Sequence, residues 1–190
     1  DQCPLILYKN MSKPLFKIYD NLFNEKEVDI LYGSFRDEKP WTFTGGATAE
    51  SMCRKFKNPL EKKDKVNKIL YKTADDILKK EELFDSVKLV NTYASSYVYG
   101  TVHDFHEDGA NDYNQIYTIM FYLNKLWTLG YAGETVFLNK ERTEIENSVI
   151  PKPGRAVIFD GFITHAAREI SRSCIELRMV ATIKFERKNV

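Results

Sequence analysis

The chain has 190 residues, of which 43% are hydrophobic, and its formal net charge is +1 at pH 7. This length and apolar content suit one domain with a sizeable core and leave little room for two independent domains. The near-neutral charge excludes a global electrostatic attraction to nucleic acid or to an anionic membrane.

The cysteines and the hydropathy pattern favour a reducing compartment and no membrane span. Three cysteines, an odd number without a C-x-x-C pair, argue against a disulfide scaffold and for a reducing environment. No apolar run approaches the 18 residues of a membrane span. The first residues show no basic-then-apolar signal, which a processed precursor would also lack. We therefore expect a cytoplasmic protein without a membrane partner.

The N-terminal part of the chain predicts helices and short strands. Short apolar runs in residues 5–19 predict an opening strand. Asn24, with Glu27 three residues later and apolar residues at helical spacing beyond, predicts a capped amphipathic helix. Residues 40–46 predict a turn and a strand. Residues 64–84 carry apolar side chains at helical spacing and predict a long helix that is packed on one face.

From residue 87 onward, strand patterns dominate. Helices followed by many short strands favour a mainly β fold in which the helices buttress a jelly roll, also called a double-stranded β-helix. We expect one domain over residues 1–190, with a support region in 1–86 and the jelly-roll core in 87–188. The predicted strands are 87–93, 97–102, 115–123, 134–138, 148–150, 155–159 and 177–186.

The segment His106-Glu107-Asp108 predicts a metal site. Residues i and i+2 of an extended segment point to the same face, so His106 and Asp108 can bind one ion while Glu107 points away. His165 is the natural third ligand, since the chain's only other histidine is His103. We expect His103 to line the pocket or to lie on the surface. Two imidazoles and one carboxylate are the ligands of the facial triad that holds non-haem Fe(II).

The order of motifs around this triad resembles the 2-oxoglutarate- and Fe(II)-dependent dioxygenases, most of all the prolyl 4-hydroxylase-type branch. The resemblance spans roughly residues 88–186, about half of the chain. It rests on H-x-D, the Tyr-Leu-Asn that ends residues 117–124, Gly-Glu-Thr-Val-Phe within 132–137, Pro-x-x-Gly-Arg-Ala-Val-Ile-Phe in 151–159, the distal His165, and a basic residue on a late strand.

The resemblance implies Fe(II) and 2-oxoglutarate as cofactors and allows ascorbate as a reductant. Fe(II) bound by three protein ligands keeps positions for the keto-acid end of 2-oxoglutarate and for O₂. The far carboxylate needs a buried cation, and a guanidinium can donate two parallel hydrogen bonds to it. Arg178, which opens the last strand, matches the family position. Arg172 lies nearer to His165, and the spacing Arg172-x5-Arg178 also occurs in nucleic-acid-demethylating oxygenases. Because Arg172 stands between two serines, we interpret it as a loop residue or a substrate contact.

Two tyrosines are further co-substrate candidates. Tyr122 matches a position where the family places a hydroxyl on the far carboxylate, although a core tyrosine is the alternative interpretation. Tyr99, seven residues before His106, is the second candidate, and Tyr97 competes with it for the same role.

The resemblance implies hydroxylation of a C–H bond, on a peptidyl proline or a similar residue, with release of succinate and CO₂. We expect a peptide or protein substrate in a groove lined by aromatic residues from 93–105. Residues 109–114 are turn-rich and are either a loop that flanks this groove or a plain connection. A small molecule is the alternative substrate. Two other functions stay open: an oxidative nucleobase demethylase, disfavoured by the near-neutral charge, and a non-catalytic jelly roll that binds another divalent ion.

Overall fold

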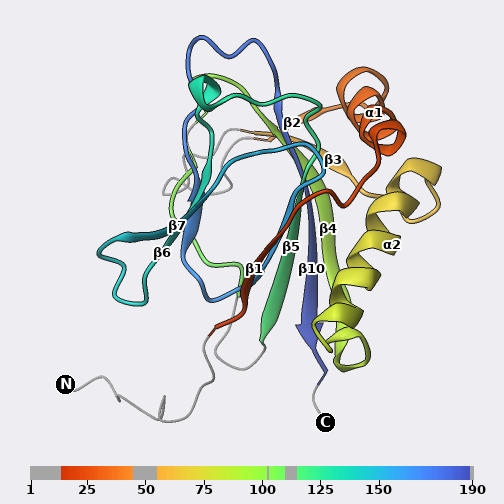
Figure 1. Ribbon diagram of the computed structural model, residues 1–190, viewed down its shortest axis with the longest axis vertical. Coiled ribbons are helices and arrows are strands. Elements are labelled where there is room, and N and C mark those ends of the chain that lie inside the picture. Colours follow the sequence, from red (N-terminus) through yellow and green to blue (C-terminus); the bar gives the residue numbers. More distant parts are fainter. Residues whose placement is uncertain (1–13, 45–54, 102, 110–114, 189–190) are drawn as a thin grey trace.

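Two antiparallel β-sheets face one another in the computed structural model, which describes residues 14–44, 55–101, 103–109 and 115–188. The larger sheet has the strand order β1-β8-β5-β10-β4-β3-β2, and the smaller has the order β7-β6-β9 (Figure 1). The strands are β1 (Phe16–Tyr19), β2 (Thr42–Thr44), β3 (Lys55–Pro59), β4 (Val87–Tyr97), β5 (Ile116–Tyr122), β6 (Thr135–Leu138), β7 (Ile145–Val149), β8 (Ala156–Asp160), β9 (His165–Ala167) and β10 (Arg178–Arg187).

Two helices cover the outer face of the larger sheet, α1 (Glu25–Gly33) and α2 (Lys65–Lys80) (Figure 1). Alternate residues of the central strands point to opposite faces of the sheet. On β5, Ile119 and Phe121 pack in the core shared with the helices, whereas Met120 and Tyr122 pack toward the smaller sheet. The predicted mainly β jelly roll with buttressing helices is therefore confirmed.

The helix starts follow the predicted capping chemistry. The Asn24 side chain accepts a hydrogen bond from the Glu27 amide, and the Glu27 carboxylate accepts one from the Asn24 amide, each over 3.0 Å. The Asp64 carboxylate caps α2 by accepting from the amides of Val66 and Asn67. Each cap satisfies backbone donors that have no partner within the helix.

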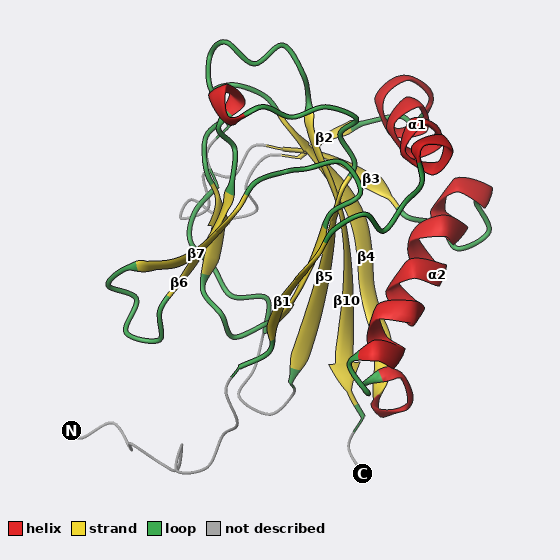
Figure 2. Cartoon of the chain, in the orientation of Figure 1, coloured by secondary structure: helices red, strands yellow, loops and turns green. Residues whose placement is uncertain are grey.

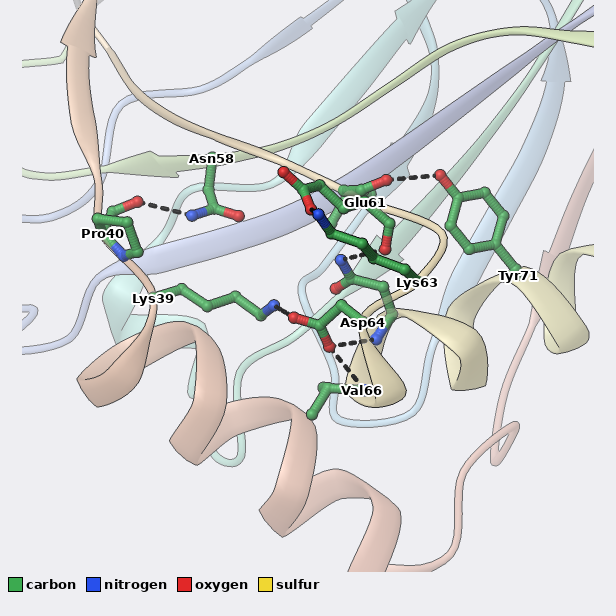
Figure 3. A network of polar contacts seen from close by, with 10 residues as sticks. Lys39, Pro40, Asn58, Glu61, Lys63, Asp64, Val66 and Tyr71 are labelled. Carbon is green, nitrogen blue, oxygen red and sulfur yellow. Dashed lines mark hydrogen bonds and ion pairs between the residues drawn. The ribbon is translucent and has the colours of Figure 1, made fainter.

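A polar network joins the start of α2 to the segment that follows α1 (Figure 3). Lys39 comes directly after the short π-helix Ser34–Glu38 and pairs with Asp64. The Asn58 side chain on β3 donates to the Pro40 carbonyl over 2.6 Å, and the Tyr71 hydroxyl donates to the Leu60 carbonyl over 2.7 Å. These bonds tie the segments next to both helices to β3 and the residues that follow it.

The structure corrects several predicted boundaries. The long helix ends at Lys80, because Glu82 takes a positive φ of 58°, and a short 3-10 helix (Phe84–Ser86) follows. β4 runs unbroken to Tyr97, and residues 98–101 form a turn in place of the predicted strand 97–102. The mainly polar β3 and the three-residue β9 have too little alternation to be predicted.

Parts of other predicted segments lie outside the residues that the structure describes. Residues 5–13 of the opening strand and residues 110–114 of the turn-rich loop are outside the described part.

The connection between β9 and β10 lies at the same end of the molecule as the 3-10 turn Leu129–Tyr131 (Figure 2), and the Ser171 amide donates to the Tyr131 carbonyl. No helix within the described ranges is long and apolar enough to cross a membrane.

Candidate metal and co-substrate site

Backbone hydrogen bonds bring the H-x-D segment to the strand that carries the distal histidine. His106 and His165 form an isolated antiparallel bridge, with N–H···O distances of 3.0 and 2.9 Å. The Asp108 amide donates to the Gly161 carbonyl over 2.8 Å. The segment therefore adds to the edge of the smaller sheet beside β9, and its alternation turns His106 and Asp108 to one side.

The side chains of His106, Asp108 and His165 converge on one point. One donor atom from each lies within 4.8 Å of the others. The His106 Nε2 atom is 3.6 Å from Asp108 Oδ1, and the His165 Nε2 atom is 3.8 Å from Asp108 Oδ2. In the part of the chain that the structure describes, this is the one cluster of at least three such donors.

The other ring nitrogens orient the two imidazoles. His106 Nδ1 lies 3.0 Å from the Asp104 carbonyl oxygen, and His165 Nδ1 lies 2.9 Å from the Ile163 carbonyl oxygen. A proton on each Nδ1 would be donated to the backbone carbonyl and would leave both Nε2 lone pairs for an ion, as is usual for metal-bound histidines. This donor set, two imidazoles and a carboxylate, fits Fe(II).

The charge states also suit a metal site. Burial lowers the pKa of His165 to about 4, so the imidazole is neutral at neutral pH, the form that binds a metal. Burial alone would raise the pKa of the Asp108 carboxyl, but the contacts with His165, Lys184 and Thr118 outweigh it, and the pKa lies below its usual value. Asp108 is therefore an anion in the pocket.

Of the three candidate ligands, only His106 is appreciably exposed to solvent. The His106 side chain is 37% exposed, whereas those of His165 and Asp108 are 5% and 4% exposed. His103 lines the pocket beside His106, with ring centroids 4.6 Å apart, but it is not part of the donor cluster. His106 is therefore the candidate ligand that solvent reaches most easily.

Arg178 lies in the same pocket and is 1% exposed. Its Nε donates to the Gly133 carbonyl over 2.5 Å, and a terminal nitrogen donates to the Thr135 hydroxyl over 2.7 Å. No Asp or Glu of the described segments forms an ion pair with it, and burial lowers the pKa of the guanidinium, which nevertheless stays a cation. A buried cation without a carboxylate partner is costly unless an anion binds beside it. The far carboxylate of 2-oxoglutarate fits this requirement.

Two tyrosines surround the guanidinium. The Arg178 Cζ atom lies 5.3 Å from the Tyr97 ring centroid and 5.6 Å from that of Tyr122, and the Tyr122 hydroxyl donates to Thr135 over 2.8 Å. The structure does not bring Tyr99 there. Tyr99 is 55% exposed in the turn after β4, because the strand alternation that turns Tyr97 into the pocket ends with the strand.

The structure adds residues that the sequence interpretation missed, and it places Arg172 outside the pocket. Thr118 donates to Asp108 Oδ2 over 2.7 Å, and Lys184 donates to Asp108 Oδ1 over 2.6 Å. The alternation that starts at Arg178 could have indicated Lys184, which lies an even number of residues along the same strand. Arg172 lies in an exposed turn.

Glu107 lies between the two candidate ligands and points away from them, as predicted. Its carboxylate pairs with Arg142 and accepts a hydrogen bond from the Thr164 hydroxyl over 3.1 Å. Because Thr164 precedes His165, this contact helps to hold the H-x-D segment in place.

Comparisons with known proteins agree with this site. Residues 89–185 match the model of the 2OG-Fe(II) oxygenase superfamily. No curated protein sequence matches the chain. Among solved structures, a Pseudomonas putida prolyl-4-hydroxylase is similar with a TM-score of 0.70 and 18% identity, over 92% of this chain and 93% of that chain.

Two other similar structures contain bound molecules. A Trichoplax adhaerens prolyl hydroxylase in complex with a peptide fragment of the hypoxia inducible factor oxygen degradation domain has a TM-score of 0.66 and 15% identity, over 90% of this chain and 82% of that chain. HygX from Streptomyces hygroscopicus, with nickel, 2-oxoglutarate and hygromycin B bound, has a TM-score of 0.63 and 12% identity, over 91% and 83%. At these identities, the similarity shows the fold. The family match covers half of the chain, and the chain therefore belongs to the 2OG-Fe(II) oxygenase superfamily, which uses Fe(II) and 2-oxoglutarate.

Proposed function

We propose that the chain hydroxylates a C–H bond of a peptide, on a prolyl or similar residue, and releases succinate and CO₂. His106, Asp108 and His165 would hold the iron, and Arg178 with Tyr122 would bind the far carboxylate of 2-oxoglutarate. When bound, the two cofactors supply the oxidation by O₂, in which one oxygen atom enters the substrate and the other enters succinate. The support region and the jelly-roll core would act as one oxygenase domain, since α1 and α2 share a core with the larger sheet.

The protein side chains orient the reactants and limit the access of water. Arg178 and Thr135 are buried at the closed end of the pocket, so a carboxylate there would exchange water for fixed donors. The Asp108 carboxylate is held through both oxygens, by Thr118 and Lys184. The accessible edge of His106 leaves one direction for the substrate.

The observation that carries the peptide proposal is a pair of exposed aromatic side chains that are close in the sequence to pocket residues. Tyr99 is 55% exposed and Phe105 is 45% exposed. Tyr99 is two residues from the pocket-lining Tyr97, and Phe105 precedes His106. Proline-rich segments bind surfaces that carry aromatic rings, so exposed rings next to the pocket segments suit a prolyl peptide.

The similar structures are consistent with a peptide and keep a small molecule as the second candidate. One similar prolyl hydroxylase holds a peptide fragment, and HygX holds hygromycin B. The spacing Arg172-x5-Arg178 no longer favours nucleobase demethylation, because Arg172 lies in an exposed turn. The buried Arg178 opposes a non-catalytic metal site, which has no use for a second buried cation.

A succinate-release assay tests the proposal. The panel contains proline-rich peptides, free amino acids, small molecules and methylated oligonucleotides, and mass spectrometry detects a gain of one oxygen. We expect turnover with at least one peptide, its loss in His106→Ala and its retention in Arg172→Ala. Turnover confined to oligonucleotides or small molecules would contradict the peptide proposal. Fe(II) and 2-oxoglutarate binding without any turnover across the panel would favour a non-catalytic role.

A further inference from the structure

Lys184 on β10 holds the candidate metal ligand Asp108 through a direct ion pair. Its Nζ atom donates to Asp108 Oδ1 over 2.6 Å, while the Thr118 hydroxyl donates to Oδ2 over 2.7 Å. Thr118 and Lys184 are direct partners across the β5–β10 ladder. Adjacent residues of two paired strands therefore hold one carboxylate oxygen each, which prevents the carboxylate from rotating.

This group is largely shielded from solvent. The Asp108 side chain is 4% exposed and that of Lys184 is 16% exposed, and Thr118 is fully buried. Charges act strongly on one another in such surroundings. The ammonium and the carboxylate cancel, so Asp108 already has a counter-charge before any ion binds.

A divalent cation that binds without 2-oxoglutarate therefore enters a site in which the charge of Asp108 is already neutralised by Lys184. It leaves the group of metal, Asp108 and Lys184 with two positive charges in excess, and the ammonium repels it over a short distance. 2-Oxoglutarate is a dianion. Its carboxylate groups bring the two negative charges that this group and Arg178 attract.

We propose that Lys184 is a positioning residue that couples metal binding to 2-oxoglutarate binding. It weakens the binding of the metal alone and favours the metal together with the dianion. This inference rests on the proposed metal centre at His106, Asp108 and His165. It would keep the iron from being held firmly while the co-substrate is absent.

Mn(II) titrations with and without saturating 2-oxoglutarate test the coupling, with the electron paramagnetic resonance signal of free Mn(II) as the readout. Lys184→Met removes the charge and the donor, Lys184→Gln keeps a donor without the charge, and Lys184→Arg keeps the charge. Lys88→Met is the matched control, because Lys88 lies on the neighbouring strand and forms a surface ion pair with Glu186.

We expect 2-oxoglutarate to tighten Mn(II) binding to the unmodified protein by about tenfold or more. Lys184→Met and Lys184→Gln should bind Mn(II) alone about tenfold more tightly, and they should lose most of the enhancement by 2-oxoglutarate. Lys184→Arg and Lys88→Met should behave like the unmodified protein. A hydrogen-bonding role alone would leave Lys184→Gln normal.

Three outcomes would overturn the inference. One is weaker Mn(II) binding in both neutral variants, and another is an unchanged enhancement. The third is loss of folding in both, seen by thermal unfolding, which would show that Lys184 holds the fold. Asp108→Ala separates this inference from the proposed metal centre. If it binds Mn(II) as well as the unmodified protein does, the metal centre itself is wrong.

Discussion

Arg178 and Tyr97 are direct partners across the β10–β4 ladder, and the guanidinium carbon lies 5.3 Å from the centroid of the tyrosine ring. The two residues occupy the first position of β10 and the last position of β4. Their pairing sets the closed end of the co-substrate pocket, because the ring faces a cation that has no carboxylate partner among the described residues.

Replacing Arg178 should weaken 2-oxoglutarate binding steeply. Arg178→Ala leaves the far carboxylate buried without its cation, a loss of about 2–5 kcal/mol or about 30-fold to several-thousand-fold in affinity. The measurement is an anaerobic titration of the visible charge-transfer band of the Fe(II)–keto-acid complex. Arg172→Ala is the control and should bind normally, since Arg172 lies in an exposed turn. A larger effect in Arg172→Ala would show that this assignment is wrong.

Alanine substitution of a candidate ligand should abolish the charge-transfer band, whereas the same substitution of the neighbouring His103 should not. His106→Ala, Asp108→Ala and His165→Ala should each lose the charge-transfer band, because each removes one of three donors within 4.8 Å. His103→Ala should retain it, since His103 lines the pocket outside the donor cluster. A full-strength band in His106→Ala would contradict the assignment.

Replacing Tyr97 should weaken the binding of 2-oxoglutarate, whereas replacing Tyr99 should weaken the binding of a peptide substrate. Tyr97→Leu removes the aromatic face beside Arg178, a contact worth about 0.5–2 kcal/mol, so 2-oxoglutarate should bind about twofold to 30-fold more weakly. Tyr99→Leu should leave 2-oxoglutarate binding unchanged and raise the KM for a peptide substrate, because Tyr99 is exposed and does not line the pocket of Arg178. Equal losses of 2-oxoglutarate affinity in both variants would argue against this division.

Gly161 should tolerate no side chain. A Cβ atom there would lie 2.9 Å from the Ile116 Cβ and 3.2 Å from the Gly109 amide nitrogen, and the Gly161 carbonyl accepts the Asp108 amide. Gly161→Ala should cost about 1–3 kcal/mol in the free energy of unfolding and also weaken Mn(II) binding.

Gly33→Ala is the matched control for Gly161. Gly33 has helical backbone angles, and a Cβ atom added there would meet no atom within 4 Å, so alanine there should stabilise the protein by about 0.5–1 kcal/mol. Denaturant unfolding measures both variants. A Gly161→Ala variant with unchanged stability and normal Mn(II) affinity would show that the H-x-D segment shifts to make room for the added methyl group.

The Asp64 cap should stabilise the protein in a pH-dependent manner. Burial alone would raise the pKa of the Asp64 carboxyl, but hydrogen bonds from Lys39 and from the amides of Asn67 and Val66 lower it below its usual value. A depressed carboxyl pKa contributes stability above the unfolded-state pKa, and this contribution is lost as the pH falls through the folded-state pKa. Asp64→Ala should therefore cost about 1 kcal/mol at pH 7 and progressively less in acid.

Urea unfolding at several pH values measures the Asp64 effect. Asp76→Ala is the control on the same helix, and it should leave the free energy of unfolding nearly unchanged, because Asp76 forms only an exposed pair with Lys72. An Asp64→Ala cost that does not change with pH would mean that the charge is not responsible.

Much of the fold was predictable because the signals are local. The capping box at Asn24 and Glu27 specifies where α1 begins, and helical spacing specifies α2. Strand alternation predicted β5 and β10 and placed Arg178 on one face. These patterns depend on residues a few positions apart, so they can be read without knowledge of the partner strands.

The candidate site was predictable only in part, since its remaining contacts are long-range. His106 and Asp108 share a face because they are two residues apart, which the sequence alone determined. The choice of Tyr97 over Tyr99 depends on where β4 stops pairing with β10, and Lys184 meets Asp108 across 76 residues. Only the tertiary structure decided these contacts, because strand register is set by the packing of the whole sheet and not by the neighbours of any one residue.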